Sequence, residues 1–311
     1  MPHKVHIADP GLFTTIQDKG RPYLRKYGIP VSGAMDWAAY QFANHLVGNK
    51  NTSPVLECTL KGGSFKFDSR AVIAITGADM QAKINHVLCP TNESLLIQPG
   101  DTLEMGYARR GCRAYLAIQG DWELEKVFDS YSTYTLAGFG GLHGRALQKG
   151  DCIQWNGTAR YQHREIPKEL IPYYSNRVKL RVLKGPEWDW LSQADKEMFL
   201  SSEFIVQNQS DRMGIRLEGE SVLSTESGQI ISSATVPGTI QLTTSGQPII
   251  LMKDGQTTGG YPRIATVIES ELSRLSQIPP GSKIQFKLVD YKEATQLLAY
   301  YKDLLNDFEQ S

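Results

Sequence analysis

Short apolar runs separated by glycine dominate the hydrophobic pattern of this chain. Three of them are Ala71-Val72-Ile73-Ala74-Ile75, Tyr115-Leu116-Ala117-Ile118 and Pro248-Ile249-Ile250-Leu251-Met252. Runs of this length, rich in β-branched and aromatic residues, are typical of strands in barrels or sandwiches. Glycine turns precede apolar strands at 98–101, 147–151 and 280–284, in both halves of the chain. The pattern therefore predicts a mainly β protein that is rich in hairpins.

Four segments show helical spacing instead. In the first, Met35, Ala39, Phe42 and Leu46 recur every three or four residues, with Gly48-Asn49 as a stop. We therefore expect a helix over 34–48, with Ser32 as a possible N-cap. The other predicted helices are Trp188 to Phe199, Ala265 to Gln277 and Tyr291 to Phe308, the last with an apolar stripe of Ala294, Leu298, Tyr301 and Leu305.

The domain boundary is expected in a polar stretch. Residues from about 158 to 177 carry Pro167 and Pro172, and the strand-like 178–183 follows directly. A length of 311 residues favours two domains over one. We expect an N-terminal β-rich lobe over 1–165, a C-terminal barrel lobe over 178–290 and a C-terminal helix over 291–311.

Charge and composition exclude several classes of protein. Lys and Arg number 33 and Asp and Glu number 33, so bulk electrostatics favours neither nucleic acid nor an anionic membrane. No signal-like leader or run of the roughly 18–20 apolar residues of a membrane span is present, and the cytoplasm is the expected compartment. The four cysteines form no Cys-x-x-Cys pair, so reduced core thiols are expected.

Familiar catalytic motifs are absent. The chain has no phosphate-binding Gly-x4-Gly-Lys-Ser/Thr loop, no Gly-x-Gly-x-x-Gly after a strand, no His-Glu-x-x-His and no Gly-x-Ser-x-Gly. Its six histidines are scattered without ligand spacing, so no metal site is expected. No cofactor bound by this chain is evident from the sequence.

The first candidate site lies at the start of the helix predicted over 34–48. Ser32 and Gly33 precede Asp36 there, and free backbone N–H groups at a helix start bind an anion or a carbonyl oxygen. An ordinary capped helix with Asp36 near its positive end is the alternative, and these physics alone favour it. Glu57, a further carboxylate, lies in an apolar strand and must face solvent or have a buried partner.

A second candidate is a pair of arginines. Arg212 and Arg216 are four residues apart, which places both guanidiniums on one face of a strand or a helix, and Gly214 between them leaves room for a ligand. Two guanidinium forks clamp a carboxylate or a phosphate. Surface arginines bridging Asp211 or Glu218 are an equally weighted alternative.

The densest candidate is the segment 251–262, which joins an apolar strand to the helix predicted from Ala265. Gln256 can donate and accept hydrogen bonds at once, which suits a lactam, a urea or a carboxyamide. Its neighbours offer two hydroxyls and permissive backbone N–H groups: Thr257, Thr258, Gly259 and Gly260. A glycine turn is the alternative, but such a turn seldom needs Gln, two Thr and Tyr261 together.

Several motifs, in order along the chain, closely resemble the allophanate hydrolase subunit 2 family. They are GLFTTIQDKGR at 11–21, SGAMD at 32–36, DRMGIRL at 211–217 and QTTGGYP at 256–262, with shorter matches at Ala137–Gly141 and Pro237–Gln241. The resemblance extends from about residue 5 to 290. The family includes the C subunit of bacterial 5-oxoprolinase and the KipA-type antagonist of a sporulation kinase inhibitor.

The resemblance implies cyclophilin-like β-barrel architecture in two lobes with a few peripheral helices. It also implies a B subunit partner, similar to allophanate hydrolase subunit 1 and KipI, and an A subunit. Such complexes open 5-oxo-L-proline to L-glutamate and use ATP, through a phosphorylated lactam oxygen followed by hydrolysis. Because the chain has no recognised nucleotide motif, the sequence leaves open whether ATP binds this chain or a partner subunit.

The resemblance also suggests roles for the candidate residues. Arg212, Arg216 and the amides of Gly259-Gly260 would hold the substrate carboxylate or the developing phosphate charge, and Gln256 would read the ring amide. The expected catalytic residues are Arg212, Arg216, Gln256, Thr257, Thr258 and Tyr261. The expected substrate-binding residues are Ser32, Gly33, Asp36, Gly214, Gln241, Gly259 and Gly260.

Two other functions stay open. The family is similar to the second half of the carboxyltransferase domain of urea carboxylase, where the same turn would read a ureido group with a biotin carrier supplied by another chain. A regulatory protein that binds a kinase inhibitor is the other alternative. A prolyl isomerase is discounted, because a fold does not carry its function.

The chain departs from the usual family pattern twice near the candidate site. Gly255 stands where an arginine is common, and Thr243-Thr244 lies in place of a typical double proline. If the missing arginine normally meets substrate charge, then Lys253, Arg263 or a partner subunit must compensate, or this member acts on a different substrate.

Overall fold

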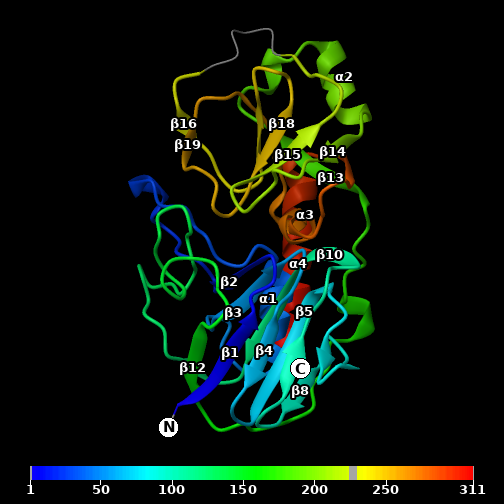
Figure 1. The fold of residues 1–311 in the computed structure, drawn as a ribbon. Helices are drawn as coiled ribbons and strands as arrows, with labels where there is room; N and C mark the ends of the chain where they lie inside the picture. The colour runs from blue at the N-terminus through cyan, green and yellow to red at the C-terminus, as the bar shows by residue number, and fades with distance from the viewer. Residues whose placement is uncertain (1, 224–229, 311) are drawn as a thin grey trace. The chain divides into compact units, whose positions relative to one another are not determined.

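The computed structural model describes residues 2–223 and 230–310, and the chain forms two units (Figure 1). The first unit comprises Met1–Arg21 and Ser32–Tyr174, and the second comprises Pro22–Val31 and Ser175–Ser311. The chain therefore passes into the second unit for Pro22–Val31, returns, and leaves the first unit again after Tyr174, inside the polar stretch at 158–177. Met1 and Ser311, the end residues of the expected lobe 1–165 and helix 291–311, lie outside the described residues.

The first unit is built from two sheets, one α-helix and one 3-10 turn. Its elements are β1 His3–Asp9, β2 Phe13–Gln17, α1 Trp37–Leu46, β3 Val55–Thr59, β4 Ser64–Phe67, β5 Ala71–Asp79, β6 Lys83–Ile84, β7 Val87–Leu88, β8 Ser94–Ile97, β9 Thr102–Glu104, β10 Arg110–Ile118, β11 Asp121–Trp122, β12 Cys152–Asn156 and η2 Lys168–Leu170. One sheet has the order β11-β12-β1-β4-β9-β6-β7, and the other has the order β2-β3-β10-β5-β8.

The alternation of side chains in β5 and β10 explains why both strands are almost wholly buried. Ile73 and Ile75 of β5, like Leu116 of β10, join the core that the two sheets share. The intervening residues face α1, and the hydroxyl of Thr76 donates a 2.6 Å hydrogen bond to the carbonyl of Ala39 on that helix. A strand covered on both faces reads as a continuous apolar run, as these two do.

The second unit is a closed barrel. Its elements are η1 Arg25–Tyr27, β13 Arg177–Lys184, η3 Trp188–Trp190, α2 Gln193–Ser201, β14 Phe204–Val206, β15 Gly214–Glu218, β16 Ser233–Ala234, β17 Thr239–Leu242, β18 Pro248–Leu251, β19 Thr258–Gly259, β20 Arg263–Val267, η4 Glu269–Glu271, α3 Leu272–Ser276, β21 Lys283–Leu288 and α4 Tyr291–Gln310. The barrel order is β13-β20-β17-β18-β15-β14-β21, with β13 and β21 parallel. The prediction of a mainly β protein with a barrel and few helices is confirmed.

An aromatic cluster fills one side of the barrel unit. Phe199 of α2 stacks on Phe286 of β21 with ring centroids 4.6 Å apart, and Phe204 of β14 lies 5.8 Å from the same ring. All three side chains are buried. Offset and edge contacts of this kind add about 0.5–1.5 kcal/mol per pair beyond the burial of area.

Three helix predictions need correction. The first helix is α1, Trp37–Leu46, shorter than the predicted 34–48, and its N-cap is Asp36 rather than Ser32. The segment from Trp188 begins with a 3-10 turn and becomes α-helical only at Gln193. The segment from Ala265 continues as strand β20 to Val267, because its alternating apolar residues fill the barrel, and only the five residues of α3 are α-helical there.

The helix predicted from Tyr291 is present as α4. Among the residues that the structure describes, no helix combines the length and apolarity needed to cross a membrane.

Candidate functional site

A pocket with a volume of about 260 Å³ lies in the barrel unit and collects five of the predicted site residues. Those five are Gly214, Arg216, Gln241, Gln256 and Tyr261, and the rest of the lining is Asp211, Met213, Thr243, Ile249 and Leu251. The lining comes from the neighbouring strands β17, β18 and β15, from the residues just before β15 and just after β17, and from the segment between β18 and β20. The barrel thus brings together motifs separated by about 40 residues in sequence.

Two glutamine side chains form the amide part of the pocket. Nε2 of Gln256 donates a 3.0 Å hydrogen bond to Oε1 of Gln241, and Nε2 of Gln241 donates at 3.4 Å to the carbonyl of Tyr261. Gln241 is buried, whereas Gln256 is exposed. Among the described residues, the carbonyl oxygen of the Gln256 side chain and its second N–H have no hydrogen-bond partner, and an amide group needs one acceptor and one donor of this kind.

Gly259 is required by the buried glutamine. A Cβ at position 259 would lie 2.4 Å from Nε2 of Gln241, closer than atoms approach without displacement. Strand β19, which contains Gly259, pairs with β16, so the backbone there has little freedom to move away. The glycine in this motif therefore makes space for a side chain, which is a role different from the predicted offer of a backbone N–H.

Arg216 supplies the positive charge of the pocket. It lies in β15, its side chain is exposed, and its guanidinium makes no ion pair with an acidic group among the described residues. A guanidinium in this situation is available to a carboxylate or phosphate of a ligand, with which it forms two parallel hydrogen bonds. The sequence-based alternative, a surface bridge to Asp211 or Glu218, is not formed.

Arg212 is not part of the pocket lining. Its Nε donates at 2.7 Å to one oxygen of Asp254, its Nη2 donates at 3.3 Å to the other, and both side chains are buried. Strand β15 begins only at Gly214, so the spacing of four does not place Arg212 on the same strand face as Arg216. Arg212 therefore ties the loop after β18 to the start of β15.

The same loop explains Gly255. A Cβ at this position would lie 2.8 Å from the carbonyl oxygen of Met213 and 3.0 Å from that of Met252. The backbone N–H of Asp254 donates to the carbonyl of Arg212 at 2.9 Å, which fixes this close approach. In this chain the loop therefore packs too tightly for an arginine at position 255.

Arg25 is a residue of the site region that the sequence analysis missed. Its Nη2 donates to the carbonyl of Thr235 and, at 3.3 Å, to the carbonyl of Gln256, and the Thr235 hydroxyl donates to the latter carbonyl at 2.6 Å. Burial lowers the pKa of the Arg25 guanidinium from its ordinary value. The returning segment Pro22–Val31 thus holds the backbone from which Gln256 projects, and no spacing in the sequence indicates a pairing 231 residues apart.

The other residues of the Thr-Thr-Gly-Gly motif surround the pocket without lining it. Thr257 accepts a backbone hydrogen bond from Thr235 at 3.0 Å, and Thr258 is exposed on β19. Gly260 accepts from the N–H of Ile230 at 2.9 Å. The motif therefore shapes the β16-β19 pair, and its side chains do not converge on the pocket.

Arg263, one of the expected substitutes for the missing arginine, already has a partner. Its guanidinium donates to both oxygens of Glu187, at 2.9 and 2.7 Å, and to the carbonyl of Ala234 at 2.8 Å. Both side chains of the ion pair are mostly buried. Arg263 of β20 is therefore held by Glu187, in the segment after β13, and its charge is already paired. Of Arg212, Arg216 and Arg263, only Arg216 is exposed and lines the pocket.

Ser32, Gly33 and Asp36 belong to the first unit. Asp36 caps α1 by accepting the N–H of Ala39 at 3.1 Å, as the alternative of an ordinary capped helix predicts. The N–H of Met35 is bound at 2.8 Å by Glu57, and that of Asp36 is bound at 2.7 Å by the hydroxyl of Tyr115. The expected anion site is thus filled by the chain's own carboxylate.

Glu57 has the buried partner that its position in an apolar strand requires. It also accepts a 2.8 Å hydrogen bond from the hydroxyl of Tyr115. Burial, followed by the charges of Glu57 and Asp36, raises the pKa of that hydroxyl well above its ordinary value. Tyr115 therefore stays protonated as a donor. Together, Glu57 and Tyr115 bind the backbone N–H groups of Met35 and Asp36 just before α1.

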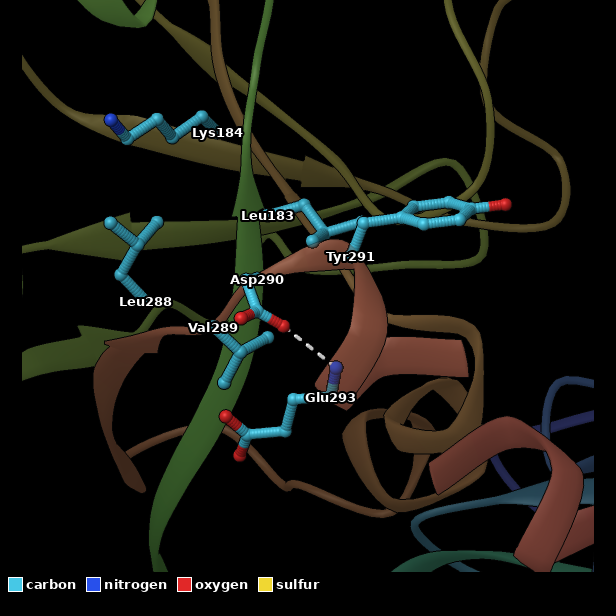
Figure 2. A pocket seen from close by; sticks show the side chains of 7 residues that line it. All are labelled: Leu183, Lys184, Leu288, Val289, Asp290, Tyr291 and Glu293. Atoms are coloured by element: carbon cyan, nitrogen blue, oxygen red, sulfur yellow. Dashed lines mark hydrogen bonds between the residues drawn. The ribbon is translucent and has the colours of Figure 1, made fainter. Parts of the chain in front are cut away.

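A larger pocket in the barrel unit, with a volume of about 580 Å³, holds none of the predicted residues. It is lined by Leu183, Lys184, Leu288, Val289, Asp290, Tyr291 and Glu293 (Figure 2). Asp290 accepts the N–H of Glu293 at 2.7 Å, as Figure 2 shows, and so caps α4. Lys184 and Tyr291 extend in different directions in the same view, so polar groups do not converge there as they do around Gln256.

The cysteines offer no activated thiol. All four are free, and Cys58 and Cys112 are buried. Burial raises the pKa of the Cys58 thiol to about 12 and that of the Cys112 thiol above its ordinary value. A nucleophilic cysteine needs the opposite shift.

Comparison with known proteins places this geometry in a family. Residues 27–288 match the model described as carboxyltransferase domain, subdomain A and B. The 5-oxoprolinase C subunit of Escherichia coli is 38% identical over 98% of this chain and 96% of its own length. The urea amidolyase of Saccharomyces cerevisiae is 35% identical over 95% of this chain, which spans only 17% of that protein.

A solved structure shows the same fold. The urea carboxylase of Kluyveromyces lactis superposes with a TM-score of 0.94 and 31% identity, over 99% of this chain and 29% of that one. The resemblance seen in the sequence motifs is thereby confirmed over almost the full chain.

Proposed function

This chain belongs to the family of the carboxyltransferase domain, subdomains A and B, and we propose that it is the C subunit of a multisubunit 5-oxoprolinase. Near-full-length similarity to proteins named as the C subunit of 5-oxoprolinase, from two bacteria, supports a subunit of a hydrolase complex. The proposal adds that A and B subunits complete the enzyme and that the complex uses ATP to open 5-oxo-L-proline to L-glutamate.

The observation that carries this proposal is one pocket that holds an amide side chain, Gln256, and a guanidinium, Arg216, that pairs with no acidic group among the described residues. Gln256, oriented by Gln241, offers an acceptor and a donor, and Arg216 offers two parallel N–H groups. A cyclic amide that bears a carboxylate carries the matching groups on one small ring. The pocket volume of about 260 Å³ suits a molecule of that size.

The chemistry explains why such a reaction needs ATP. Resonance makes the lactam carbonyl a poor electrophile, and transfer of the ATP γ-phosphoryl group to its oxygen, with release of ADP, makes the ring carbon electrophilic. Water then adds to that carbon, the ring C–N bond breaks with a proton going to the nitrogen, and hydrolysis of the resulting glutamyl phosphate releases phosphate and L-glutamate. In this chain, Gln256 would hold the ring amide in place, and Arg216 would bind the ring carboxylate or the phosphate. The amino-acid sequence has no recognised nucleotide motif, so the proposal places ATP on a partner subunit.

The experiment is reconstitution. The chain is mixed with its co-encoded A and B partners, and glutamate release from 5-oxoproline and ATP is measured with each component omitted in turn. Release that disappears when this chain is omitted supports the proposal. Release that persists without this chain would refute it.

A carboxyltransferase is the second candidate, and the similarity to urea amidolyase and urea carboxylase favours it. In that case Gln256 would bind a ureido group, and a biotin carrier would have to come from another chain. Carboxylation of urea by the reconstituted mixture, dependent on a biotinylated partner, would identify this activity. Binding of the B partner with neither activity would instead favour a KipA-type regulatory role.

A further inference from the structure

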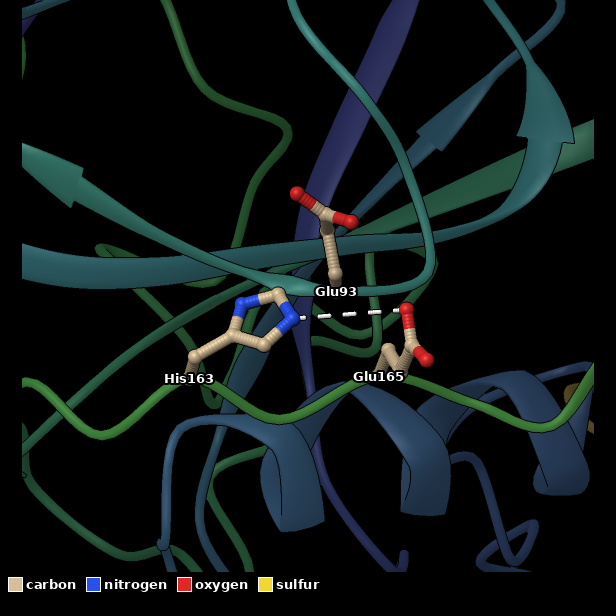
Figure 3. A group of neighbouring side chains, drawn as sticks. All are labelled: Glu93, His163 and Glu165. Carbon is tan, nitrogen blue, oxygen red and sulfur yellow. Dashed lines mark ion pairs between the residues drawn. The ribbon is translucent and has the colours of Figure 1, made fainter.

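Three side chains of types that bind metal ions meet in the first unit. They are Glu93, His163 and Glu165, and one ligand atom from each lies within 4.8 Å of the other two (Figure 3). Glu93 immediately precedes β8, and the other two residues come from the polar stretch that follows β12. The sequence analysis expected no metal site because the six histidines show no ligand spacing.

The backbone holds these two segments together. Glu93 and Glu165 form an antiparallel bridge, in which the N–H of Ser94 donates to the carbonyl of Arg164 at 2.8 Å. The buried hydroxyl of Ser94 adds a second tie, because it donates to the carbonyl of Gln162 and accepts the N–H of Arg164, both at 2.9 Å. The three side chains therefore project from a fixed frame, so little ordering is required when a ligand binds.

The two carboxylates of the cluster have no basic partner in the part of the chain that the structure describes, apart from the His163 imidazole. Among the described residues, no Lys or Arg forms an ion pair with Glu93 or Glu165, and His163 approaches Glu165 only to 4.0 Å. The nearest guanidinium in sequence, that of Arg164, is occupied: it donates to the carbonyl of His45 at 2.8 Å and, at 3.4 Å, to Gln162. Two neighbouring carboxylates repel each other unless a proton or a cation lies between them.

We propose that Glu93, His163 and Glu165 bind a divalent transition-metal ion, with Zn²⁺ favoured. Two carboxylate oxygens and one imidazole nitrogen form a mixed oxygen and nitrogen set, which suits Zn²⁺. Mg²⁺ prefers oxygen ligands and keeps its water, so it competes poorly here. Three protein ligands leave a position for water, and the bound ion would fasten residues 163–165 to the start of β8.

The test uses the full chain, stripped of metal with a chelator, and titrates ZnCl₂ by calorimetry. The proposal expects one saturable site per chain and a rise in melting temperature with Zn²⁺. His163→Asn and Glu93→Gln should each lower the affinity by at least about tenfold, because even residues that only support metal ligands typically cost 10- to 100-fold. Absence of saturable Zn²⁺ binding to the unaltered chain would overturn the proposal.

His86→Asn is the matched control. His86 is an exposed histidine with one carboxylate, Glu104, at 2.8 Å and no third ligand among the described residues, and its left-handed backbone accepts Asn. This variant should bind Zn²⁺ like the unaltered chain. Equal affinity in the His163, Glu93 and His86 variants would assign binding to another place and refute the site.

Co²⁺ distinguishes the cluster from the cysteines. The cobalt complex of a site made from oxygen and nitrogen lacks the thiolate charge-transfer absorption that Cys89 or Cys152 would produce. A strong thiolate band that survives in His163→Asn would also refute the assignment.

Discussion

Gln256 reaches Gln241 across neighbouring elements of the barrel unit, its Nε2 lying 3.0 Å from the other's Oε1. The contact engages one N–H of the Gln256 amide and so limits how that amide can turn. The exposed carbonyl end and the second N–H are left for a ligand. We therefore expect recognition of a substrate amide to depend on both glutamines.

Replacing Gln256 by Ala removes both hydrogen-bonding groups that would meet the ring amide. Two neutral hydrogen bonds are together worth about 1–3 kcal/mol, so kcat/KM of the reconstituted complex should fall by roughly 5- to 150-fold. Initial rates of glutamate release measure this change. Thr258→Ala, at an exposed position outside the pocket lining, should retain near-normal rates. A Gln256 variant as active as the Thr258 variant would remove Gln256 from the site.

Gly259→Ala should displace Gln241 without removing any polar group. The added Cβ would lie 2.4 Å from Nε2 of Gln241, so this side chain must shift and release Gln256. We expect a loss of activity comparable with that of Gln256→Ala. Gly106→Ala is the control, because a Cβ there would meet only the carbonyl oxygen of Met80, at 3.6 Å, and Gly106, like Gly259, has no positive φ; its melting temperature gives the general cost of losing a glycine. Full activity of Gly259→Ala would show that the contact between Gln256 and Gln241 is dispensable.

Arg216→Ala should act mainly on substrate binding. A hydrogen bond to a charged group contributes about 1.5–3 kcal/mol, so KM for 5-oxoproline should rise by roughly 10- to 150-fold. Arg216→Lys keeps the charge and loses the planar fork, so its KM should lie between those of the unaltered chain and Arg216→Ala. If Arg216 instead meets a phosphate formed during the reaction, kcat will fall while KM stays constant. Unchanged kcat and KM would exclude both roles.

Arg212→Ala should destabilise the barrel unit, because it leaves the carboxylate of Asp254 buried without a partner. Removal of one member of a buried pair typically costs about 3–5 kcal/mol. Chemical denaturation followed by tryptophan fluorescence measures this loss. The double variant Arg212→Met with Asp254→Leu should recover much of it, since no charge then stays buried. A fully stable Arg212→Ala protein with low activity would return Arg212 to the residues that bind substrate.

Asp151 makes the stability of the first unit dependent on pH. Arg145 donates to both of its oxygens, at 2.7 and 2.8 Å, and this holds the pKa of the Asp151 carboxyl below its ordinary value of 3.8. A carboxyl with a lowered folded pKa stabilises the protein above the ordinary value, and the contribution disappears as pH falls through the folded pKa. The denaturation midpoint should therefore fall more steeply with acidification in the unaltered chain than in Asp151→Asn.

The comparison requires denaturation series between about pH 3 and 6 for both proteins. Asp121→Asn, at an exposed position, serves as the control and should follow the unaltered chain. Parallel curves for the unaltered chain and Asp151→Asn would show that the pair with Arg145 contributes nothing.

The sequence predicted the β architecture and the glutamine of the pocket for identifiable physical reasons. Apolar runs such as that in β5 correctly predicted strands, because a strand buried on both faces needs no alternation with polar residues. Gln256 was selected because a simple turn does not need a glutamine. The spacing rule failed for Arg212 because β15 begins after it. It also failed for Ala265, where a period of two in the barrel resembles a short apolar helix face.

Contacts between distant segments were beyond sequence reasoning. Arg25 reaches a carbonyl 231 residues away, and Glu93 lies near His163 because a strand bridge joins Glu93 to Glu165. Neither pair leaves a local signal, because complementary hydrogen bonds need no particular spacing along the chain. Only an arrangement in space reveals them.

The excursion of Pro22–Val31 into the second unit means that no single cut yields a complete barrel unit. A gene fragment that begins at residue 175 would lack Arg25, and with it the donor that holds the carbonyls of Thr235 and Gln256. Fusion, duplication or exchange of domains at one junction therefore cannot transfer the intact pocket region. The two segments of the second unit must therefore be encoded together. A fragment over 175–311 should need at least a separate peptide covering 22–31 to complete it.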